Sequence, residues 1–371
     1  MIIRSLKVTN FRNYDRFNIT LGSKMNIFIG NNASGKTNIL EAIAILGLTK
    51  SFRNGLDCDV IKFGRKKAVI EGRVLNNKQI KDLKIEFLEK DKNIYVNSKK
   101  VKKYADYLSN LNIIVFTPND LDIIKGSPSI RRNLLNMTLS QISYSYLVTY
   151  NEYNKILKTR NEYLKILFTN GIADKTYLDV LTDQLVEKAV LIYQERYKYL
   201  SLVNNYISDI YNSITEDNRV IKIEYKPNIV INNYEVEDIR KSLTNTYRKN
   251  YRRELSAGMT LFGPHRDDFC FIMDNNTDMK IYASEGQQKC AVLAYKLSSI
   301  PIFKENNGSN PVLLLDDIFS ELDLNKRNKL LKYVSEDIQS IITTTDLKNI
   351  SKKTLDSAII FKVNDGKVER S

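Results

Sequence analysis

The sequence predicts an α/β protein with a mixed sheet, an antiparallel annex and an inserted all-helical lobe. Three observations support this prediction. Strand-like segments lie near both ends of the chain, a strand, a loop and a helix follow one another over residues 25–48, and long helical patterns fill the middle. We therefore expect residues 1–120 and 255–371 to form one domain, with residues 121–254 inserted into it as a helical lobe carrying a short antiparallel hairpin.

The first 97 residues give the strands of this domain and one helix. Short apolar segments at 3–12, 15–21 and 24–30 have the length and composition of strands. From Asn38 onward, apolar residues recur at helical spacing. Residues 59–97 then alternate between apolar and polar side chains, which is typical of a half-buried antiparallel sheet.

The middle of the chain predicts a helical hairpin. Residues 147–167 and 177–211 are rich in Tyr and Leu at helical spacing, and Asn170-Gly171 separates them. At 1.5 Å per residue, a first helix of about 25 residues spans about 40 Å. After Gly258 the chain returns to strand-like segments, and those at 311–317, 340–346 and 358–363 have the apolar runs of buried parallel strands.

Composition narrows the class of protein. Lys and Arg number 57 against 43 Asp and Glu, a formal net charge of +14, which favours a polyanionic partner, either nucleic acid or anionic lipid. The three cysteines, Cys58, Cys270 and Cys290, are too few and too scattered for a disulfide framework or a four-ligand zinc site. Apolar runs stay well below the roughly 18 residues of a membrane span. We expect a cytoplasmic protein with no membrane association.

A phosphate-binding loop is the strongest motif. The spacing GxxxxGK[ST] predicts ATP contacts from Gly30, Asn31, Asn32, Ala33, Ser34, Gly35, Lys36, Thr37 and Asn38. Backbone N–H groups and the positive end of the following helix would face the phosphates. Lys36 would contact the β- and γ-phosphates, and the Thr37 hydroxyl would be a ligand of Mg²⁺. A plain glycine turn is the alternative, but the strand before the loop and the helix after it favour nucleotide binding.

Two carboxylates follow the apolar strand at 311–315. Asp316 is placed to lie near Mg²⁺ and Asp317 near the attacking water. Taken alone, such a pair is more often a turn or a helix cap. The phosphate loop in the same chain makes the catalytic interpretation the better one.

Two further segments complete the candidate site. Ser284, Gly286 and Gln287 open a helical pattern, so the serine hydroxyl and glycine backbone are suited to a phosphate, although an ordinary helix cap has the same appearance. Ser320, Glu321 and Asp323 lie just after the paired carboxylates and read as a loop and a helix start capped by Ser320. The order of these motifs is that of ABC-type ATPases.

With these motifs in place, the whole chain resembles the bacterial RecF family, relatives of the SMC chromosome ATPases that lack long coiled coils. The more specific similarities lie in segments that other ABC ATPases do not share: residues 116–121 (FTPNDL), 125–128 with Arg131-Arg132, and 263–268 (GPHRDD). Four positions depart from the family pattern. Asn119 and Asn136 replace acids, Leu134 replaces an aromatic residue, and Glu285 replaces Gln within the signature.

The resemblance implies an ABC/SMC-type ATPase head that forms an ATP-dependent homodimer. In this arrangement the phosphate loop of one head and Ser284 and Gly286 of a second head enclose one ATP. Asp317 would be the general base or the group that orients the attacking water. Asp323 would bridge the heads, and Asn119 or Asp120 would lie in a nucleotide-sensing loop. Residues 343–346 contain no switch histidine, so a weak, Mg²⁺-dependent ATPase with slow, DNA-stimulated hydrolysis is expected.

The resemblance also implies the partners: double-stranded and gapped DNA bound without sequence preference, RecR, and further RecO and RecA, for RecA loading in recombinational repair, fork maintenance and SOS induction. Basic clusters would grip the DNA phosphates. They are Arg65 to Lys67, Lys99 to Lys103, Arg131-Arg132, Arg248 to Arg253 and Lys326-Arg327. Each cluster alone could be ordinary solvated surface.

Other classes fit less well. An ATPase linked to a nuclease of the overcoming-lysogenisation type is the alternative, but it needs a catalytic domain for which we expect too little chain after Asp323. Transporter ATPases lack the helical insertion, and chromosome organisers need much longer coiled coils. His265 is the one histidine, which excludes histidine-rich metal sites, and we expect it to be hydrogen-bonded. Asp267 and Asp268 are expected to form a structural network with Arg266.

Overall fold

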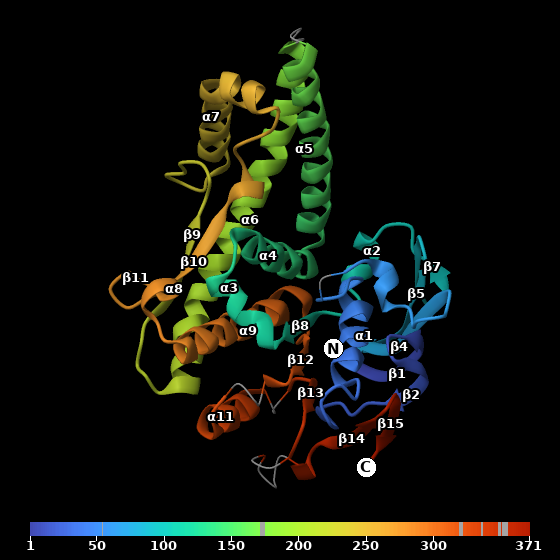
Figure 1. The fold of residues 1–371 in the computed structure, drawn as a ribbon. Coiled ribbons are helices and arrows are strands. Elements are labelled where there is room, and N and C mark those ends of the chain that lie inside the picture. Colours follow the sequence, from blue (N-terminus) through green and yellow to red (C-terminus); the bar gives the residue numbers. More distant parts are fainter. Residues whose placement is uncertain (54, 171–174, 319–321, 335–336, 348–349, 351–354) are drawn as a thin grey trace. The chain divides into compact units, whose positions relative to one another are not determined.

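The computed structural model describes residues 1–53, 55–170, 175–318, 322–334, 337–347, 350 and 355–371 (Figure 1). The described chain forms two compact units. The first contains Met1–Asp120, Ile210–Asn218 and Lys296–Ser371, and the second contains Leu121–Asp209 and Arg219–Tyr295.

The first unit contains two six-stranded sheets. One is antiparallel, with the order β2-β1-β4-β5-β6-β7, and its strands are β1 (Ile2–Phe11), β2 (Tyr14–Thr20), β4 (Lys67–Asn76), β5 (Gln79–Leu88), β6 (Lys92–Val96) and β7 (Lys99–Lys100). This is the predicted annex. Burial alternates along β4 because one face of the sheet contacts the core and the other faces solvent.

The second sheet of this unit is mixed, with the order β15-β14-β3-β13-β12-β8. Its strands are β3 (Met25–Ile29), β8 (Ile113–Phe116), β12 (Val312–Asp316), β13 (Ser340–Thr344), β14 (Ile359–Asn364) and β15 (Lys367–Arg370). The pairs β12–β13, β13–β3 and β14–β3 are parallel, which confirms the parallel strands expected at the C-terminal end. Strands β12 and β13 are buried along their whole length.

Helix α1 (Lys36–Leu48) packs against strands of both sheets, including β4 and β12. Contact on two sides explains why the segment is apolar around most of its circumference. It lies at the centre of the main hydrophobic core, with Ile39, Ile43 and Leu46 fully buried. Two other helices of this unit are α2 (Ala105–Leu108) and α11 (Leu324–Val334).

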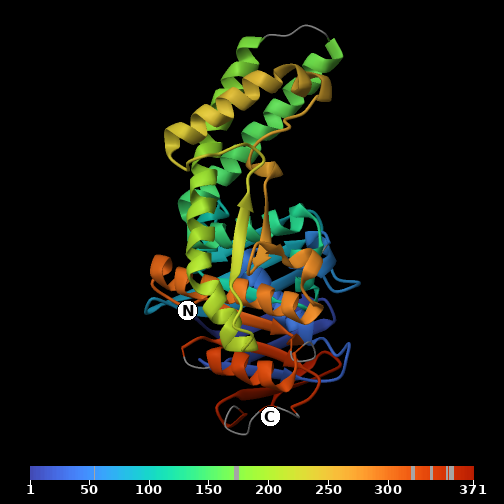
Figure 2. The same cartoon turned by 90° about the vertical axis from the view of Figure 1, so that its left-hand side faces the viewer.

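The second unit is mainly helical, and Figure 2 shows its long helices. They are α3 (Asp122–Lys125), α4 (Pro128–Ile142), α5 (Tyr144–Asn170), α6 (Lys175–Thr215), α7 (Val236–Ala257), α8 (Met279–Tyr282) and α9 (Glu285–Asn307); the last turns of α6 and the larger part of α9 belong to the first unit. Helices α5 and α6 form the predicted hairpin; Gly171, where the break was expected, lies outside the described residues. Helix α7 packs against α5.

One expectation for this region needs correction. Residues 121–254 are not entirely helical, because Ile221–Lys226 form β9. This strand pairs with β10 (Asp268–Met273), which pairs with β11 (Thr277–Asp278), to give a three-stranded antiparallel sheet. The apolar residues of β9 are buried at alternate positions, a strand pattern too short to stand out between two long helices. In the described ranges, no helix combines the length and apolar character that a membrane span requires.

Candidate nucleotide-binding site

The phosphate loop connects β3 to α1 in the first unit. A Cβ on Gly30 would lie 2.3 Å from the backbone oxygen of Val363, and one on Gly35 would lie 2.6 Å from Nδ2 of Asn13. Gly35 also has a φ of 108°, in the left-handed region. Both motif glycines are therefore required by the fold of this chain. The strand–loop–helix order predicted for residues 25–48 is confirmed.

The loop holds polar groups that suit an anion. The Ser34 hydroxyl is buried and has no hydrogen-bond partner within the described part of the chain. A helix leaves its first N–H groups without intrahelical acceptors, and here those of α1 follow the loop directly. An unsatisfied buried hydroxyl at the N-terminal end of a helix fits a phosphate as the missing partner.

The Lys36 side chain extends back to the start of the loop. Its Nζ donates to the backbone oxygens of Gly30 at 2.7 Å and Asn31 at 2.8 Å, and the residue is buried. Burial lowers the pKa of Lys36, and the nearby charges of Asp317 and Asp316 oppose this shift. The ammonium group is thus held at the mouth of the loop between neutral carbonyls, where a phosphate would be a stronger acceptor.

The structure brings Thr37 and the paired carboxylates together. The Thr37 hydroxyl donates to Oδ1 of Asp316 at 2.8 Å, across 279 residues of sequence. The Thr343 hydroxyl donates to the same oxygen at 2.8 Å and accepts from the Asp317 backbone N–H at 3.0 Å. Burial raises the pKa of Asp316. Asp317 has a φ of 46°, so the chain turns sharply as it leaves β12.

This oxygen set fits Mg²⁺. The ion prefers hard oxygen ligands and keeps several waters, so one hydroxyl and one carboxylate from the protein suffice. Thr37 and Asp316 are hydrogen-bonded directly and could both turn to the same ion. In the described residues there is no cluster of three or more His, Cys, Asp or Glu side chains that could hold a metal by itself.

Sequence reasoning missed several residues that shape this site. Arg53 donates to the Asn38 side chain at 2.9 Å, and its charge opposes the rise in the pKa of Asp316 that burial causes. The buried Tyr14 donates through its hydroxyl to the Gly35 carbonyl at 3.0 Å, and Asn13 accepts from the Asn38 amide at 2.8 Å. The loop is therefore supported by residues from β2 and from the turn before it. No motif spacing links them to the loop.

Ser284 and Gln287 belong to the second unit and form a reciprocal cap at the start of α9. The Ser284 N–H donates to Oε1 of Gln287 at 3.0 Å, and the Gln287 N–H donates to the Ser284 hydroxyl at 3.3 Å. This is a capping box, so the capping interpretation is confirmed. Ser284 and Gly286 remain exposed, and a Cβ on Gly286 would meet nothing within 4 Å.

Glu285, the departure from the family pattern, has two basic neighbours. Its carboxylate lies 3.1 Å from Lys289 and 3.4 Å from Lys125. Hydrogen bonds from Lys289 and then Lys125 lower the pKa of Glu285. The added negative charge in the signature is thus balanced by cations of the same unit.

Asp323 caps α11. Its Oδ1 accepts from the Lys326 N–H at 2.9 Å and its Oδ2 lies 2.8 Å from the Lys326 ammonium, which lowers the pKa of Asp323. The cap of this helix is therefore Asp323, whereas we expected Ser320. Ser320 and Glu321 themselves lie outside the described residues.

The expected nucleotide-sensing segment follows β8. Asp120 lies 2.5 Å from the buried Lys296 ammonium and accepts from the Thr117 hydroxyl at 2.9 Å. Lys296 also donates to the Val115 carbonyl at 2.6 Å. Asn119 is exposed beside them. Of the two candidates, Asn119 is thus the residue that a ligand could reach. Asp120 is already bonded to Lys296 and Thr117.

His265 and the two acids after it are structural, as expected. The Tyr153 hydroxyl lies 2.7 Å from Nδ1 of His265, and Nε2 lies 3.2 Å from the Thr260 carbonyl. The carbonyl accepts only, so Nε2 carries the proton and Nδ1 accepts from the tyrosine. Burial lowers the pKa of His265 to about 4, so the ring is neutral at pH 7.

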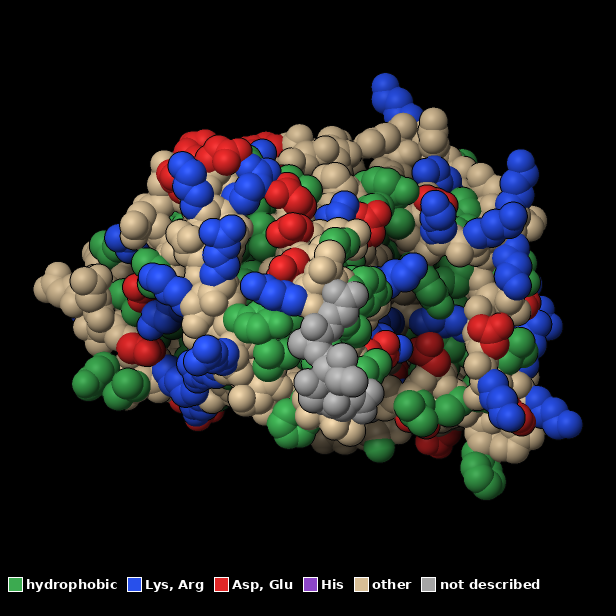
Figure 3. Space-filling view, turned by 90° about the horizontal axis from the view of Figure 1, so that it is seen from above, with side chains coloured by type: hydrophobic (Ala, Val, Ile, Leu, Met, Phe, Trp, Pro, Cys, Tyr) green, Lys and Arg blue, Asp and Glu red, His purple; other side chains and the backbone are tan. Residues whose placement is uncertain are grey.

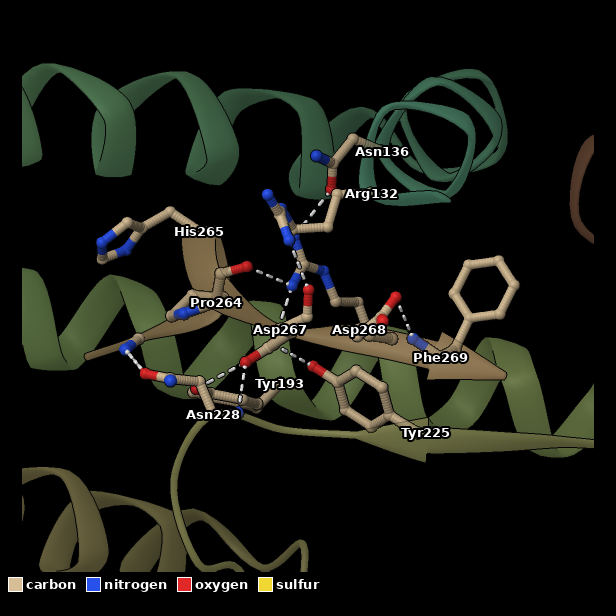
Figure 4. A network of polar contacts seen from close by, with 12 residues as sticks. Arg132, Asn136, Tyr193, Tyr225, Asn228, Pro264, His265, Asp267, Asp268 and Phe269 are labelled. Atoms are coloured by element: carbon tan, nitrogen blue, oxygen red, sulfur yellow. Dashed lines mark hydrogen bonds and ion pairs between the residues drawn. The ribbon is translucent and has the colours of Figure 1, made fainter. Parts of the chain in front are cut away.

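Asp267 is the centre of a buried network (Figure 4). Its carboxylate accepts from Arg196 at 2.8 Å, from the Tyr193 hydroxyl at 3.1 Å, from the Asn228 N–H at 2.8 Å and from the Tyr225 hydroxyl. Asp268 pairs with Arg131 at 2.6 Å. The prediction that Arg266 pairs with Asp267 and Asp268 is wrong. The Arg266 side chain is exposed and donates to the sulfur of Met259 instead.

The basic clusters differ in what they contact. Lys99 and Lys100 on β7 and the pairs Arg248-Lys249 and Arg252-Arg253 on α7 are exposed. Arg131 is buried and paired with Asp268, so the prediction that Arg131 contacts DNA phosphates is wrong. Figure 3 shows Lys and Arg side chains spread over one face, with acidic and apolar side chains between them.

Comparisons with known proteins find similar chains over almost the whole sequence. The chain matches the family model for the RecF/RecN/SMC N terminal domain over residues 2–369. It is 37% identical to the DNA replication and repair protein RecF of Oceanobacillus iheyensis, covering 99% of this chain and 100% of that one. It is 38% identical to the protein of the same name from Halalkalibacterium halodurans, over the full length of both.

Solved structures give the same result. The recombination mediator protein RecF-ATP in the RecFOR pathway superposes with a TM-score of 0.92 at 32% identity, covering 100% of this chain and 97% of that one. The corresponding RecF-ATPrS structure gives a TM-score of 0.90 at 33% identity, with 99% and 97% covered. An SMC head bound to the C-terminal winged-helix domain of ScpA, 17% identical with a TM-score of 0.59, shares the fold.

Proposed function

The chain belongs to the RecF family of SMC-type ATPases, and from this premise we propose that it is an ATP-dependent DNA-binding protein of DNA replication and recombinational repair. The observation that carries the proposal is the contact between Thr37 and Asp316 beside a phosphate loop with an unsatisfied Ser34 hydroxyl. This combination provides a place for the triphosphate and for Mg²⁺ in one unit.

The chemistry is phosphoryl transfer to water. Lys36 leaves the loop carbonyls and neutralises the β- and γ-phosphates, while the loop N–H groups bind their oxygens. Thr37 and Asp316 would hold Mg²⁺, which would supply positive charge near the phosphates. Asp317 orients the attacking water. The Thr343 hydroxyl accepts a hydrogen bond from the Asp317 N–H and so fixes the backbone of Asp317. The absence of a histidine in the sequence after β13 supports slow hydrolysis, which DNA binding would stimulate.

ATP also controls assembly in this proposal. The exposed Ser284 and Gly286 of one copy contact the γ-phosphate held by a second copy, so two ATP molecules are enclosed in a homodimer. Asp323 lies at the same interface. A ligand that binds the dimer better than the monomer shifts the population towards the dimer, and hydrolysis reverses the shift.

The joined pair binds duplex and gapped DNA through phosphates and works in the cytoplasm with RecR, and further with RecO and RecA, in RecA loading, fork maintenance and SOS induction. The net charge of +14 and the exposed clusters on β7 and α7 support DNA binding. The names of the solved relatives, which refer to the RecFOR pathway, support the partners.

Sedimentation velocity with and without ATP and Mg²⁺ tests the proposal. The unaltered protein should be a monomer alone and a dimer with ATP. Lys36→Ala should lose ATP binding. Ser284→Arg should bind ATP as a monomer, because the larger side chain fills the contact with the second copy.

Ser201→Arg, at an exposed position of α6, is the matched control and should dimerise normally. Unchanged ATP affinity in Lys36→Ala would remove the loop from the mechanism. A normal dimer in Ser284→Arg would contradict the composite site.

A further inference from the structure

Phe63 is the most exposed of the large apolar side chains that the structure describes. Its relative exposure is 102%, so it contacts almost nothing in the chain. Aromatic side chains are usually buried because their large apolar surface is unfavourable in water. The whole ring of Phe63 is therefore available to a binding partner, and its surroundings indicate which kind.

A rigid turn presents this ring. The Arg65 N–H donates to the Lys62 carbonyl at 3.0 Å, and Gly64 has a φ of 76°, which are features of a type II turn with Phe63 at its second position. The Lys62 N–H donates to the Asn10 carbonyl at 2.9 Å, and Ile61 forms a bridge with Phe11. The turn is thus fastened to the end of β1.

The segment before the turn also rests on the nucleotide-binding helix. The Arg12 N–H donates to the Val60 carbonyl at 2.8 Å, and its guanidinium donates to the Asp59 carbonyl at 2.7 Å. The same guanidinium pairs with the buried Glu41 of α1. The segment that carries Phe63 is therefore fixed by hydrogen bonds and an ion pair to β1, Arg12 and α1.

The immediate surroundings of the ring are positive. Lys62, Arg65 and Lys66 flank Phe63, and Asp15 is the carboxylate that pairs with two of them, at 2.7 Å from Lys62 and 3.6 Å from Arg65. Lys66 is exposed. A single aromatic ring among cations differs from a protein-binding surface, whose centre is a cluster of apolar side chains with few charges. It is the combination that binds single-stranded nucleic acid, in which bases stack on aromatic rings while phosphates meet Lys and Arg.

We propose that Phe63 stacks on an unpaired base where single-stranded DNA meets duplex, while Lys62, Arg65 and Lys66 bind the adjacent phosphates. This site rests on the proposed function, since it requires that the protein bind DNA. Stacking needs an unpaired base, so the ring adds affinity for gapped DNA and none for uninterrupted duplex. Because every base has an aromatic face, the preference is for DNA structure and not for sequence.

Binding to two DNA molecules of equal length tests the site. One is a full duplex, and the other carries a single-stranded gap with 2-aminopurine at the first unpaired position. With ATP and Mg²⁺, the unaltered protein should quench the 2-aminopurine fluorescence and bind the gapped DNA more tightly. Phe63→Ala should lose the quenching and about ten-fold in affinity for gapped DNA, the scale of one stacked base, without a change on duplex. Phe63→Trp should keep both properties.

Phe168→Ala is the matched control, because Phe168 on α5 is also strongly exposed, at 65%. It should behave like the unaltered protein. If Phe63→Ala retains the quenching and the preference for gapped DNA, or weakens gapped and duplex DNA equally, the stacking site is wrong while the proposed function stands. If the unaltered protein binds neither DNA with ATP, the proposed function fails instead.

Discussion

Two buried aspartates in this chain have opposite surroundings. Asp267, in the second unit, is 1% exposed and accepts hydrogen bonds from Arg196, Tyr193, Tyr225 and the Asn228 backbone. Asp316, in the first unit, is 6% exposed and accepts from two hydroxyls, both on the same oxygen. Neither Thr37 nor Thr343 carries a charge.

The difference separates a structural carboxylate, Asp267, from Asp316, the carboxylate proposed to bind Mg²⁺. Burying a carboxylate is costly unless charge and hydrogen bonds compensate it. The protein itself compensates Asp267 with a guanidinium and three further donors. Burial raises the pKa of both carboxylates, so the difference lies in the donors: the hydrogen bonds that Asp316 accepts come from the neutral hydroxyls of Thr37 and Thr343, whereas Asp267 is paired with a guanidinium. A site prepared for Mg²⁺ is expected to have this property, because the ion completes it.

The largest expected effect comes from breaking the complete network. Asp267→Asn should lower the free energy of unfolding by about 3–5 kcal/mol, because it leaves the fully buried Arg196 without a counter-charge. Glu187→Gln is the control, since it removes an exposed ion pair with Arg240 in the same unit and should cost no more than about 1 kcal/mol. Urea unfolding followed by tyrosine fluorescence measures both. Equal small losses in the two variants would show that the network is not what distinguishes Asp267.

At Asp316 the expected effect is on ligand-linked stability. Asp316→Asn should leave the nucleotide-free protein about as stable as before, because it removes a charge that burial disfavours. It should lose the stabilisation by ATP and Mg²⁺, about 2.7 kcal/mol at 100 times the dissociation constant. Thermal unfolding with and without the nucleotide measures this. Asp317→Asn is the control and should keep the stabilisation; a nucleotide-stabilised Asp316→Asn protein would contradict the role of Asp316.

A smaller effect is expected from pH in the second unit. The folded-state pKa of His265, lowered to about 4 by burial, lies below its ordinary value of 6.5, so the unfolded chain binds more protons between these values. Stability is then complete above about pH 6.5 and falls as the pH drops towards 4. Between pH 7.5 and 5 the loss should be about 2 kcal/mol. Urea unfolding of His265→Gln should show a flatter pH dependence; the same slope in both proteins would exclude the histidine as its cause.

Much of the fold could be predicted because its signals are local. The alternation along β4 and the apolar run of β12 each report burial within one segment. Short strand β9 was missed because six residues between long helices carry too weak a pattern. Pairing of β9 with β10 depends on residues more than 40 positions away, which a local pattern does not contain.

Site residues were also predictable only where their signal is local in the sequence. The phosphate loop was predictable because its glycines, lysine and threonine all lie at fixed spacing within the short stretch 30–37, and the backbone geometry requires that order. The roles of Arg53 and Thr343 were not predictable. The fold alone brings the charge of Arg53 near Asp316 and the Thr343 hydroxyl within hydrogen-bond distance of Asp316 and Asp317. The buried partner of Asp267 was assigned to the neighbouring Arg266, whereas it is Arg196, 71 positions away on α6.

Gly286 has a consequence for how this protein evolves. It lies in the first turn of a helix, and a methyl group added there would meet nothing within 4 Å. Alanine is the better helix former, by roughly 1 kcal/mol in a helix interior, so the isolated chain would gain from the exchange. Any pressure to keep the glycine must come from a molecule that approaches its backbone closely. Selection for a more stable monomer would therefore favour alanine at position 286, whereas selection for the proposed ATP-bound dimer would favour glycine.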